Sequence, residues 1–212
     1  MLPLVAITER TLCQEPLALR IQKLSDGGFD TIILREKDLD EDAYEKLASN
    51  IWQALDESAR KKLVFHRFLP RFIHELPTVP SGKHNSDEAL RCLHVPLAQL
   101  TSNPGIRDSV DVLGTSIHSL EELHQAEALG VDYVIAGHIF ETSCKPGMAP
   151  RGLTFLETIT QAARVPVWAI GGITPDNAPA LWRLGAEKLC FRSSAMKEDV
   201  DELARAAQVE HS

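Results

Sequence analysis

The chain has 212 residues, of which 44% are hydrophobic and 25% are charged, and these values exclude a disordered or fibrous protein. It carries 22 Lys and Arg against 30 Asp and Glu, and the net charge of −8 argues against a protein that mainly binds nucleic acid or an anionic membrane. No apolar stretch approaches the ~18–20 residues needed to cross a bilayer, and we identify no signal peptide. The four cysteines form no Cys-x-x-Cys pair, so we expect reduced thiols in a cytoplasmic protein.

Apolar runs of strand length alternate with segments of helical periodicity from end to end. The predicted strands are 2–8, 31–36, 63–66, 93–96, 112–117, 133–138, 165–172 and 188–193. The predicted helices are 16–25, 44–55, 68–76, one that begins at a capping box at 119–122, one that begins with Thr-Pro-Asp at 174–176, and 200–207. The stretch 77–104 is rich in Pro, Gly, Ser and Asn, and outside its short strand we expect an irregular connection.

An acidic cluster lies between the second strand and the following helix, at Asp38, Asp40, Glu41 and Asp42. One interpretation is a metal site. We favour the other, in which the carboxylates complement the positive end of the helix dipole.

Eight strands, each followed by a helix or its remnant, predict an α/β fold, a single (β/α)₈ TIM barrel. Composition does not shift along the chain and no internal repeat is obvious, so residues 1–212 are expected to form one domain. The active sites of such barrels lie at the carboxyl ends of the strands, and the residues at those ends are therefore the candidates for function.

Two cations end the second strand. Arg35 and Lys37 lie two residues apart and so share one face, while Glu36 points the other way. This pair is suited to a carboxylate or phosphate group, although an exposed basic pair is the alternative.

The loops after strands seven and eight are the usual phosphate site of these barrels. Gly171 and Gly172 follow the seventh strand, and Ser193 and Ser194 follow the eighth. Backbone N–H groups of glycines approach an anion closely, which predicts a phosphate-bearing ligand; an ordinary turn is the alternative for the glycine pair.

His118 ends the fifth strand, directly before the helix cap at Ser119. The positive end of the helix dipole favours an uncharged imidazole, which is a competent general base and then a general acid. A histidine that only completes the turn is the alternative. Cys144 beside Lys145 in the loop after strand six suggests an activated thiol, but no local base is evident.

Four histidines are expected near strand ends, at positions 66, 94, 118 and 138, which raises the question of a zinc site. No His-x-His pair follows the first strand and no Asp ends the eighth. We therefore predict acid–base chemistry with no metal.

At these residues the chain resembles the thiamine phosphate synthase superfamily, and most closely its thiazole tautomerase (TenI) branch. The similar stretches are 4–8, 34–37, 114–119, 132–145 and 169–173, which follow one another along almost the whole chain. Within them, Gly-His-Ile-Phe-Glu-Thr-Ser-Cys-Lys at 137–145 is similar to the tautomerase version of its loop.

The resemblance implies a cofactor-free isomerase of thiamine biosynthesis that aromatises a dihydrothiazole carboxylate phosphate. His118 then transfers the proton. The substrate-binding positions are Arg35, Lys37, His138, Thr142 and Lys145, and the phosphate-binding positions are Gly171, Gly172, Ser193 and Ser194. The expected partner is a phosphorylated thiazole, with no nucleic acid or membrane, and a homo-oligomer is compatible with the sequence.

Two other functions stay open. A synthase would join thiazole phosphate to a pyrimidine pyrophosphate, but this chain has Phe65-His66-Arg67 and 96–99 where synthases carry magnesium-binding carboxylates. A non-catalytic protein that binds a phosphorylated ligand and regulates a pathway is the third.

Overall fold

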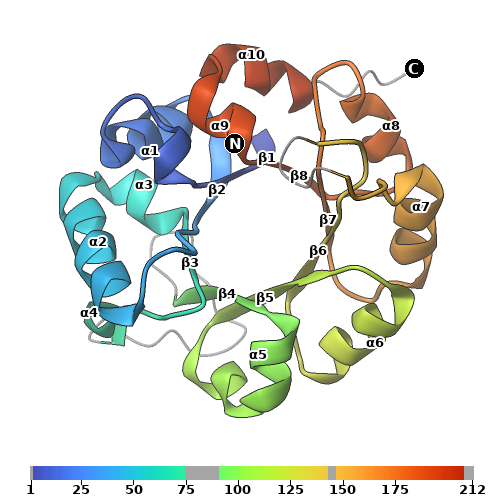
Figure 1. Cartoon of the computed structure of the whole chain (residues 1–212), viewed down its shortest axis with the longest axis horizontal. Coiled ribbons are helices and arrows are strands. Elements are labelled where there is room, and N and C mark those ends of the chain that lie inside the picture. The colour runs from blue at the N-terminus through green and yellow to red at the C-terminus, as the bar shows by residue number, and fades with distance from the viewer. Residues whose placement is uncertain (1, 75–90, 143–146, 208–212) are drawn as a thin grey trace.

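The structure is a computed structural model that describes residues 2–74, 91–142 and 147–207. All its strands are parallel neighbours in sequence order, and β8 pairs with β1 to close a barrel (Figure 1). The strands are β1 (Leu2–Ile7), β2 (Phe29–Leu34), β3 (Leu63–His66), β4 (Cys92–Pro96), β5 (Val112–Ile117), β6 (Tyr133–Gly137), β7 (Val167–Ile170) and β8 (Lys188–Phe191). The predicted TIM-barrel fold is thus confirmed.

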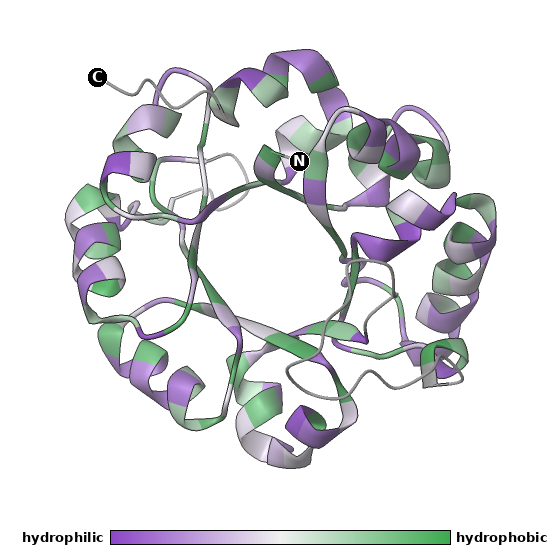
Figure 2. Cartoon of the chain, turned by 180° about the vertical axis from the view of Figure 1, so that it is seen from behind, coloured by the Kyte–Doolittle hydropathy of each residue, from purple (hydrophilic) through white to green (hydrophobic). Residues whose placement is uncertain are grey.

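Helices cover the outside of the barrel, and Figure 2 shows that they carry both hydrophobic and hydrophilic residues. They are α1 (Leu17–Asp26), α2 (Glu41–Ala54), α3 (Glu57–Lys61), α4 (Arg71–His74), α5 (Leu97–Ser102), α6 (Leu120–Ala128), α7 (Gly152–Ala162), α8 (Ala178–Arg183), α9 (Ser193–Lys197) and α10 (Val200–Ala204). Short 3₁₀ turns are η1 (Arg10–Leu12), η2 (Pro104–Ser109) and η3 (Arg205–Ala207). Within the described ranges, no helix has the length and apolar character that a bilayer crossing requires.

Alternate residues of each strand face opposite layers of the core, because side chains on a strand alternate. Leu4, Ile32 and Phe65 pack outward against helices, whereas Val5 and Ile33 point into the barrel. Both faces are buried, which explains why the strands read as continuous apolar runs.

Side-chain caps define two helix starts near the candidate site. Asp40 accepts a hydrogen bond from Ala43 N (2.9 Å) at the start of α2, and Ser119 Oγ accepts one from Glu122 N (3.1 Å) at the start of α6. Helix capping is therefore confirmed for Asp40 in the acidic cluster, and Asp38 instead pairs with Arg10.

The predicted helix start at Thr174 is wrong, because α8 begins at Ala178. The side chain of Asn177 accepts a hydrogen bond from Thr174 N (2.9 Å) and donates one to Gly172 O (2.9 Å), which holds this stretch in a turn.

Other boundaries also differ from the predictions. Strand β8 ends at Phe191, and Ser193 begins α9 rather than ending a strand. Helix α5 lies inside the stretch expected to be irregular, and α3, capped by Asp56, was not predicted. Positions 75–90 lie outside the described residues.

Gly114 on β5 is a position where the barrel interior requires a glycine. A Cβ placed there would lie 2.0 Å from the ring of Tyr133, which stacks on Trp168 with ring centroids 3.6 Å apart. We expect Gly114→Ala to lower the free energy of unfolding by about 1–3 kcal/mol, because the tyrosine must move in a packed interior. Denaturant unfolding measures the change.

The matched control is Gly105→Ala, since nothing lies within 4 Å of a Cβ at that exposed position. Its stability should stay within about 0.5 kcal/mol of wild type. Equal stability of the two variants would contradict the packing described for Tyr133.

Candidate active site

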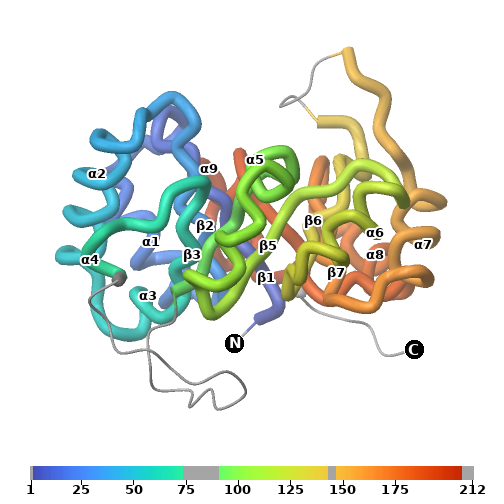
Figure 3. Tube along the Cα trace, turned by 90° about the horizontal axis from the view of Figure 1, so that it is seen from below, coloured from blue at the N-terminus to red at the C-terminus, as the bar shows by residue number. Residues whose placement is uncertain are grey.

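A cavity of about 620 Å³ lies at the carboxyl ends of the strands. Nine of the predicted site residues line it: Arg35, Lys37, His118, His138, Thr142, Gly171, Gly172, Ser193 and Ser194. Lys145, the remaining predicted residue, and Cys144 lie outside the described residues. Figure 3 shows the barrel from the side, with the described residues just before α7 rising above the rest of the barrel.

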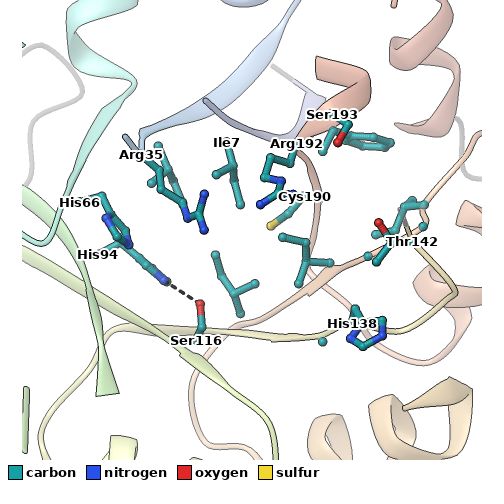
Figure 4. Close-up of a pocket in the computed structure, with 18 of the residues that line it drawn as sticks. Ile7, Arg35, His66, His94, Ser116, His138, Thr142, Cys190, Arg192 and Ser193 are labelled. Carbon is teal, nitrogen blue, oxygen red and sulfur yellow. Dashed lines mark hydrogen bonds between the residues drawn. The ribbon is translucent and has the colours of Figure 1, made fainter. Parts of the chain in front are cut away.

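The floor of the cavity is apolar. It is formed by interior side chains from five strands, namely Ile7, Ile33, Ile135, Ile170 and Cys190. Figure 4 shows Arg35, His66 and His94 on one side of this floor and Thr142 and His138 on the other. A flat apolar ring with polar substituents suits such a cavity, which combines a hydrophobic floor with polar groups at its edges.

Cations that follow two of the strands line the cavity. Arg35 and Lys37 follow β2 and line it, whereas Glu36 between them is buried and does not. Arg192, which follows β8, also lines the cavity, and its Nε lies 3.3 Å from Glu9 Oε2. These cations are suited to an anionic group of a ligand.

His66 and His94 form a buried, uncharged pair beside the floor. Their rings stack with centroids 6.0 Å apart. Burial, together with the positive charge of Arg35, lowers the pKa of His94 to about 3. Burial also lowers the pKa of His66 to about 2, with smaller contributions from His94 and Arg35.

The polar contacts of His94 reach the cavity wall. Nδ1 lies 3.2 Å from the hydroxyl of Tyr133, and Nε2 lies 2.9 Å from Ser116 Oγ (Figure 4). Ser116 lines the cavity, and the sequence analysis did not identify it, although it precedes His118 by two residues and so shares its face of β5.

The four histidines expected near strand ends all line the cavity. Within the described ranges, however, no group of three or more His, Cys, Asp or Glu is placed to hold a metal ion. The buried thiol of Cys190, with its pKa raised by burial, is also a poor ligand or nucleophile.

His118 is held at the mouth of the barrel by the cap of α6. Its backbone N–H donates to Glu122 Oε2 (2.5 Å), while Glu122 N donates to Ser119 Oγ (3.1 Å). Its ring Nδ1 is buried and has no hydrogen-bond partner among the described residues. Glu122 also lines the cavity and was not predicted to do so, although the Ser-x-x-Glu capping box was the signal for its position.

The glycine pair after β7 is required by packing against the loop after β6. Gly171 and Gly172 have φ of +107° and +64°. A Cβ at Gly171 would lie 2.3 Å from His138 Cβ, and one at Gly172 would lie 2.3 Å from Glu141 O. The glycines are thus explained without a ligand, although the same lack of side chains leaves their backbone open to the cavity.

His138 is a third buried histidine that lines the cavity. Its Nε2 lies 3.3 Å from Met148 O, a carbonyl that only accepts, so Nε2 carries the hydrogen. Its Nδ1 has no hydrogen-bond partner in the part of the chain that the structure describes.

The His66–His94 pair predicts a pH-dependent stability. In the unfolded chain both imidazoles take up protons below their ordinary pKa of 6.5. In the folded protein the pKa is about 3 for His94 and about 2 for His66, so both rings stay uncharged at higher pH. The unfolded state therefore binds more protons in this range. The free energy of unfolding should fall as the pH falls from 6.5 toward 3, by up to about 1.4 kcal/mol per pH unit for each histidine.

Denaturant unfolding at a series of pH values tests this. His66→Gln should reduce the slope of the unfolding free energy against pH by about 1.4 kcal/mol per pH unit, which corresponds to one proton. His124→Gln, at an exposed position on α6, should leave this slope unchanged. Equal slopes in wild type and His66→Gln would show that His66 is not an uncharged buried group.

Comparisons with known proteins agree on one family. Residues 95–195 match the family described as thiamine monophosphate synthase. A protein of Aquifex aeolicus named putative thiamine-phosphate synthase 2 is 31% identical over 183 residues, which cover 86% of this chain and 91% of that protein. The thiamine-phosphate synthase of Moorella thermoacetica is 30% identical, with coverage of 91% and 86%.

A solved structure supports the fold. The thiamine phosphate pyrophosphorylase of Pyrococcus furiosus superposes with a TM-score of 0.68 at 24% identity, covering 96% of this chain and 92% of that one. The chain therefore belongs to the thiamine phosphate synthase/TenI superfamily, whose members are enzymes of thiamine biosynthesis that act on phosphorylated small molecules.

Proposed function

We propose that the protein is an isomerase that aromatises a dihydrothiazole carboxylate phosphate by proton transfer at His118. The observation that carries this proposal is the place of His118, which lines the cavity at the carboxyl end of β5, directly before the cap of α6. An imidazole at this place can act as a base and then as an acid. General acid–base catalysis also requires the base to reach the proton that it abstracts.

The ligand is proposed to lie with its ring on the apolar floor and its two anionic groups at opposite edges. Its phosphate would bind the backbone at Gly171 and Gly172 and the hydroxyls of Ser193 and Ser194. The carboxylate would face Arg35 and Lys37. His138 and Thr142 line the wall nearest the phosphate, and Lys145 is assigned to the ligand from the family resemblance alone.

In the proposed reaction His118 takes a proton from a ring carbon and the electron pair moves into the ring. The imidazolium then returns a proton to the exocyclic carbon. No atom is gained or lost and no electron is transferred to another molecule, so the step needs one group that alternates between base and acid.

The second candidate is a thiamine-phosphate synthase, and the names of the relatives favour it over an isomerase. The magnesium that this reaction implies does not fit the side chains at the ends of β3 and β4. His66 is a buried uncharged imidazole, and the Gln99 side-chain amide donates to Arg67 O (2.8 Å). Mg²⁺ prefers carboxylate oxygens, and neither position supplies one. A non-catalytic binding protein is the third candidate.

Replacing His118 tests the isomerase directly. The wild-type protein should accelerate the appearance of aromatic thiazole absorbance from the dihydrothiazole carboxylate phosphate, and chelators should leave the rate unchanged. His118→Gln should lower kcat by about 10²-fold or more with little change in KM, because it removes proton transfer and keeps the pocket. His124→Gln, on an exposed face of α6, is the matched control.

A rate in His118→Gln equal to wild type would overturn the role of His118. Magnesium-dependent release of pyrophosphate from thiazole phosphate and the pyrimidine pyrophosphate would instead establish the synthase. Tight binding of the thiazole phosphate without turnover in either assay would establish the binding protein.

A further inference from the structure

The end of β1 carries three polar residues, Thr8, Glu9 and Arg10, that do not line the cavity and have no part in the proposed reaction. Strand β1 lies between β2 and β8, the strands that deliver Arg35, Lys37 and Arg192 to the cavity. The contacts of this segment reach all three cations or their immediate neighbours in the chain.

Glu36, the residue between Arg35 and Lys37, accepts hydrogen bonds from this segment. It is only 4% exposed. Its Oε1 accepts from Thr8 Oγ1 (2.7 Å) and its two oxygens accept from Arg10 N (3.1 Å each), while Oε2 also accepts from Arg10 Nη1 (3.0 Å). A buried carboxylate with this set of charge-assisted bonds has one orientation.

Thr8 also binds the backbone of Arg35, the residue before Glu36. Its Oγ1 accepts a hydrogen bond from Arg35 N (2.9 Å), so one hydroxyl joins Glu36 to the amide of Arg35. Because side chains alternate along the strand, fixing Glu36 away from the cavity turns Arg35 and Lys37 toward it.

On the other side of β1, Glu9 forms an ion pair with the third cation. Its Oε2 lies 3.3 Å from Nε of Arg192, the residue that follows β8, without the geometry of a hydrogen bond. In Figure 4, Arg35 and Arg192 flank Ile7, the last residue of β1. The segment after Ile7 therefore contacts the residues that follow both neighbouring strands, Arg35 after β2 and Arg192 after β8.

We infer that Thr8, Glu9 and Glu36 are positioning residues that set Arg35, Lys37 and Arg192 to bind an anionic group of the ligand. The role is independent of the reaction, because isomerisation and transfer would both place an anion beside these cations. The positioning role differs from a contribution to stability, because loss of these residues should weaken the binding of anions by a protein that still folds.

The test separates positioning from stability with two isosteric variants. Thr8→Val removes the hydroxyl that joins Glu36 to Arg35. Thr115→Val is the matched control, because Thr115 is also fully buried and its Oγ1 donates one bond, to Val95 O (2.7 Å), away from the cavity. Thermal unfolding and calorimetric binding of inorganic pyrophosphate and of thiazole carboxylate phosphate are measured for each.

We expect both variants to lose similar stability. Only Thr8→Val should bind about tenfold more weakly than wild type, measured with whichever of the two probes the wild-type protein binds more tightly. Thr8→Ser, which keeps the hydroxyl, should bind like wild type. Wild-type affinity in Thr8→Val, or equal losses of affinity in the two Thr→Val variants, would overturn the role of Thr8.

Glu9→Gln provides a second variant at a partly exposed position, where folding is not at risk. It should weaken binding several-fold, whereas Glu57→Gln, which removes the exposed carboxylate partner of Lys61 on α3, should not. Unchanged affinity in Glu9→Gln would show that Glu9 does not position Arg192 for anion binding. A wild-type protein that binds neither probe would overturn the inference entirely, whereas one that binds but does not isomerise would overturn only the proposed reaction.

Discussion

The cavity exists because eight parallel strands close into a barrel and alternate residues of each strand point inward. This constraint gives the interior its layers. Tyr133 fills the space above Gly114, and the isoleucines above that layer form the cavity floor. One residue further along each strand, the side chains turn outward to the helices, as Ile32 does beside Ile33. A shift of one residue in any strand would exchange the lining of the cavity with the outer core.

The charges around the cavity are divided between its edge and its interior. Arg35, Lys37 and Arg192 follow strand ends, where Glu36 accepts a hydrogen bond from Thr8 and Glu9 pairs with Arg192. Below them, His66 and His94 stay uncharged because burial and the nearby cations oppose protonation. In the proposed function an anionic ligand is attracted to the rim, while its ring meets apolar and uncharged groups. His66 and Pro96, at the ends of β3 and β4, supply no carboxylate for a hard cation.

Most of the fold was predictable because each strand is a short apolar run bounded by polar residues, and parallel barrels place all their strand ends together. The residues at those ends, such as His118 and Arg35, were found for the same reason. Apolar lining residues such as Ile7 and Ile33 were not, since they have the same residue type as the outer core and only the register separates them. Thr174 was misassigned because the side chain of Asn177 competes for its backbone amide, and Gly171 has a packing role that only the position of His138 reveals.

In the proposed reaction His118 faces the reacting carbon while the main chain at Gly171 and Gly172 holds the phosphate. A crystal structure with thiazole carboxylate phosphate bound measures both distances at once. We expect phosphate oxygens within hydrogen-bond distance of those two glycines and of Ser193, with the imidazole of His118 in contact with the thiazole ring. A phosphate bound instead beside Arg35 and Lys37, with the ring out of reach of His118, would contradict it.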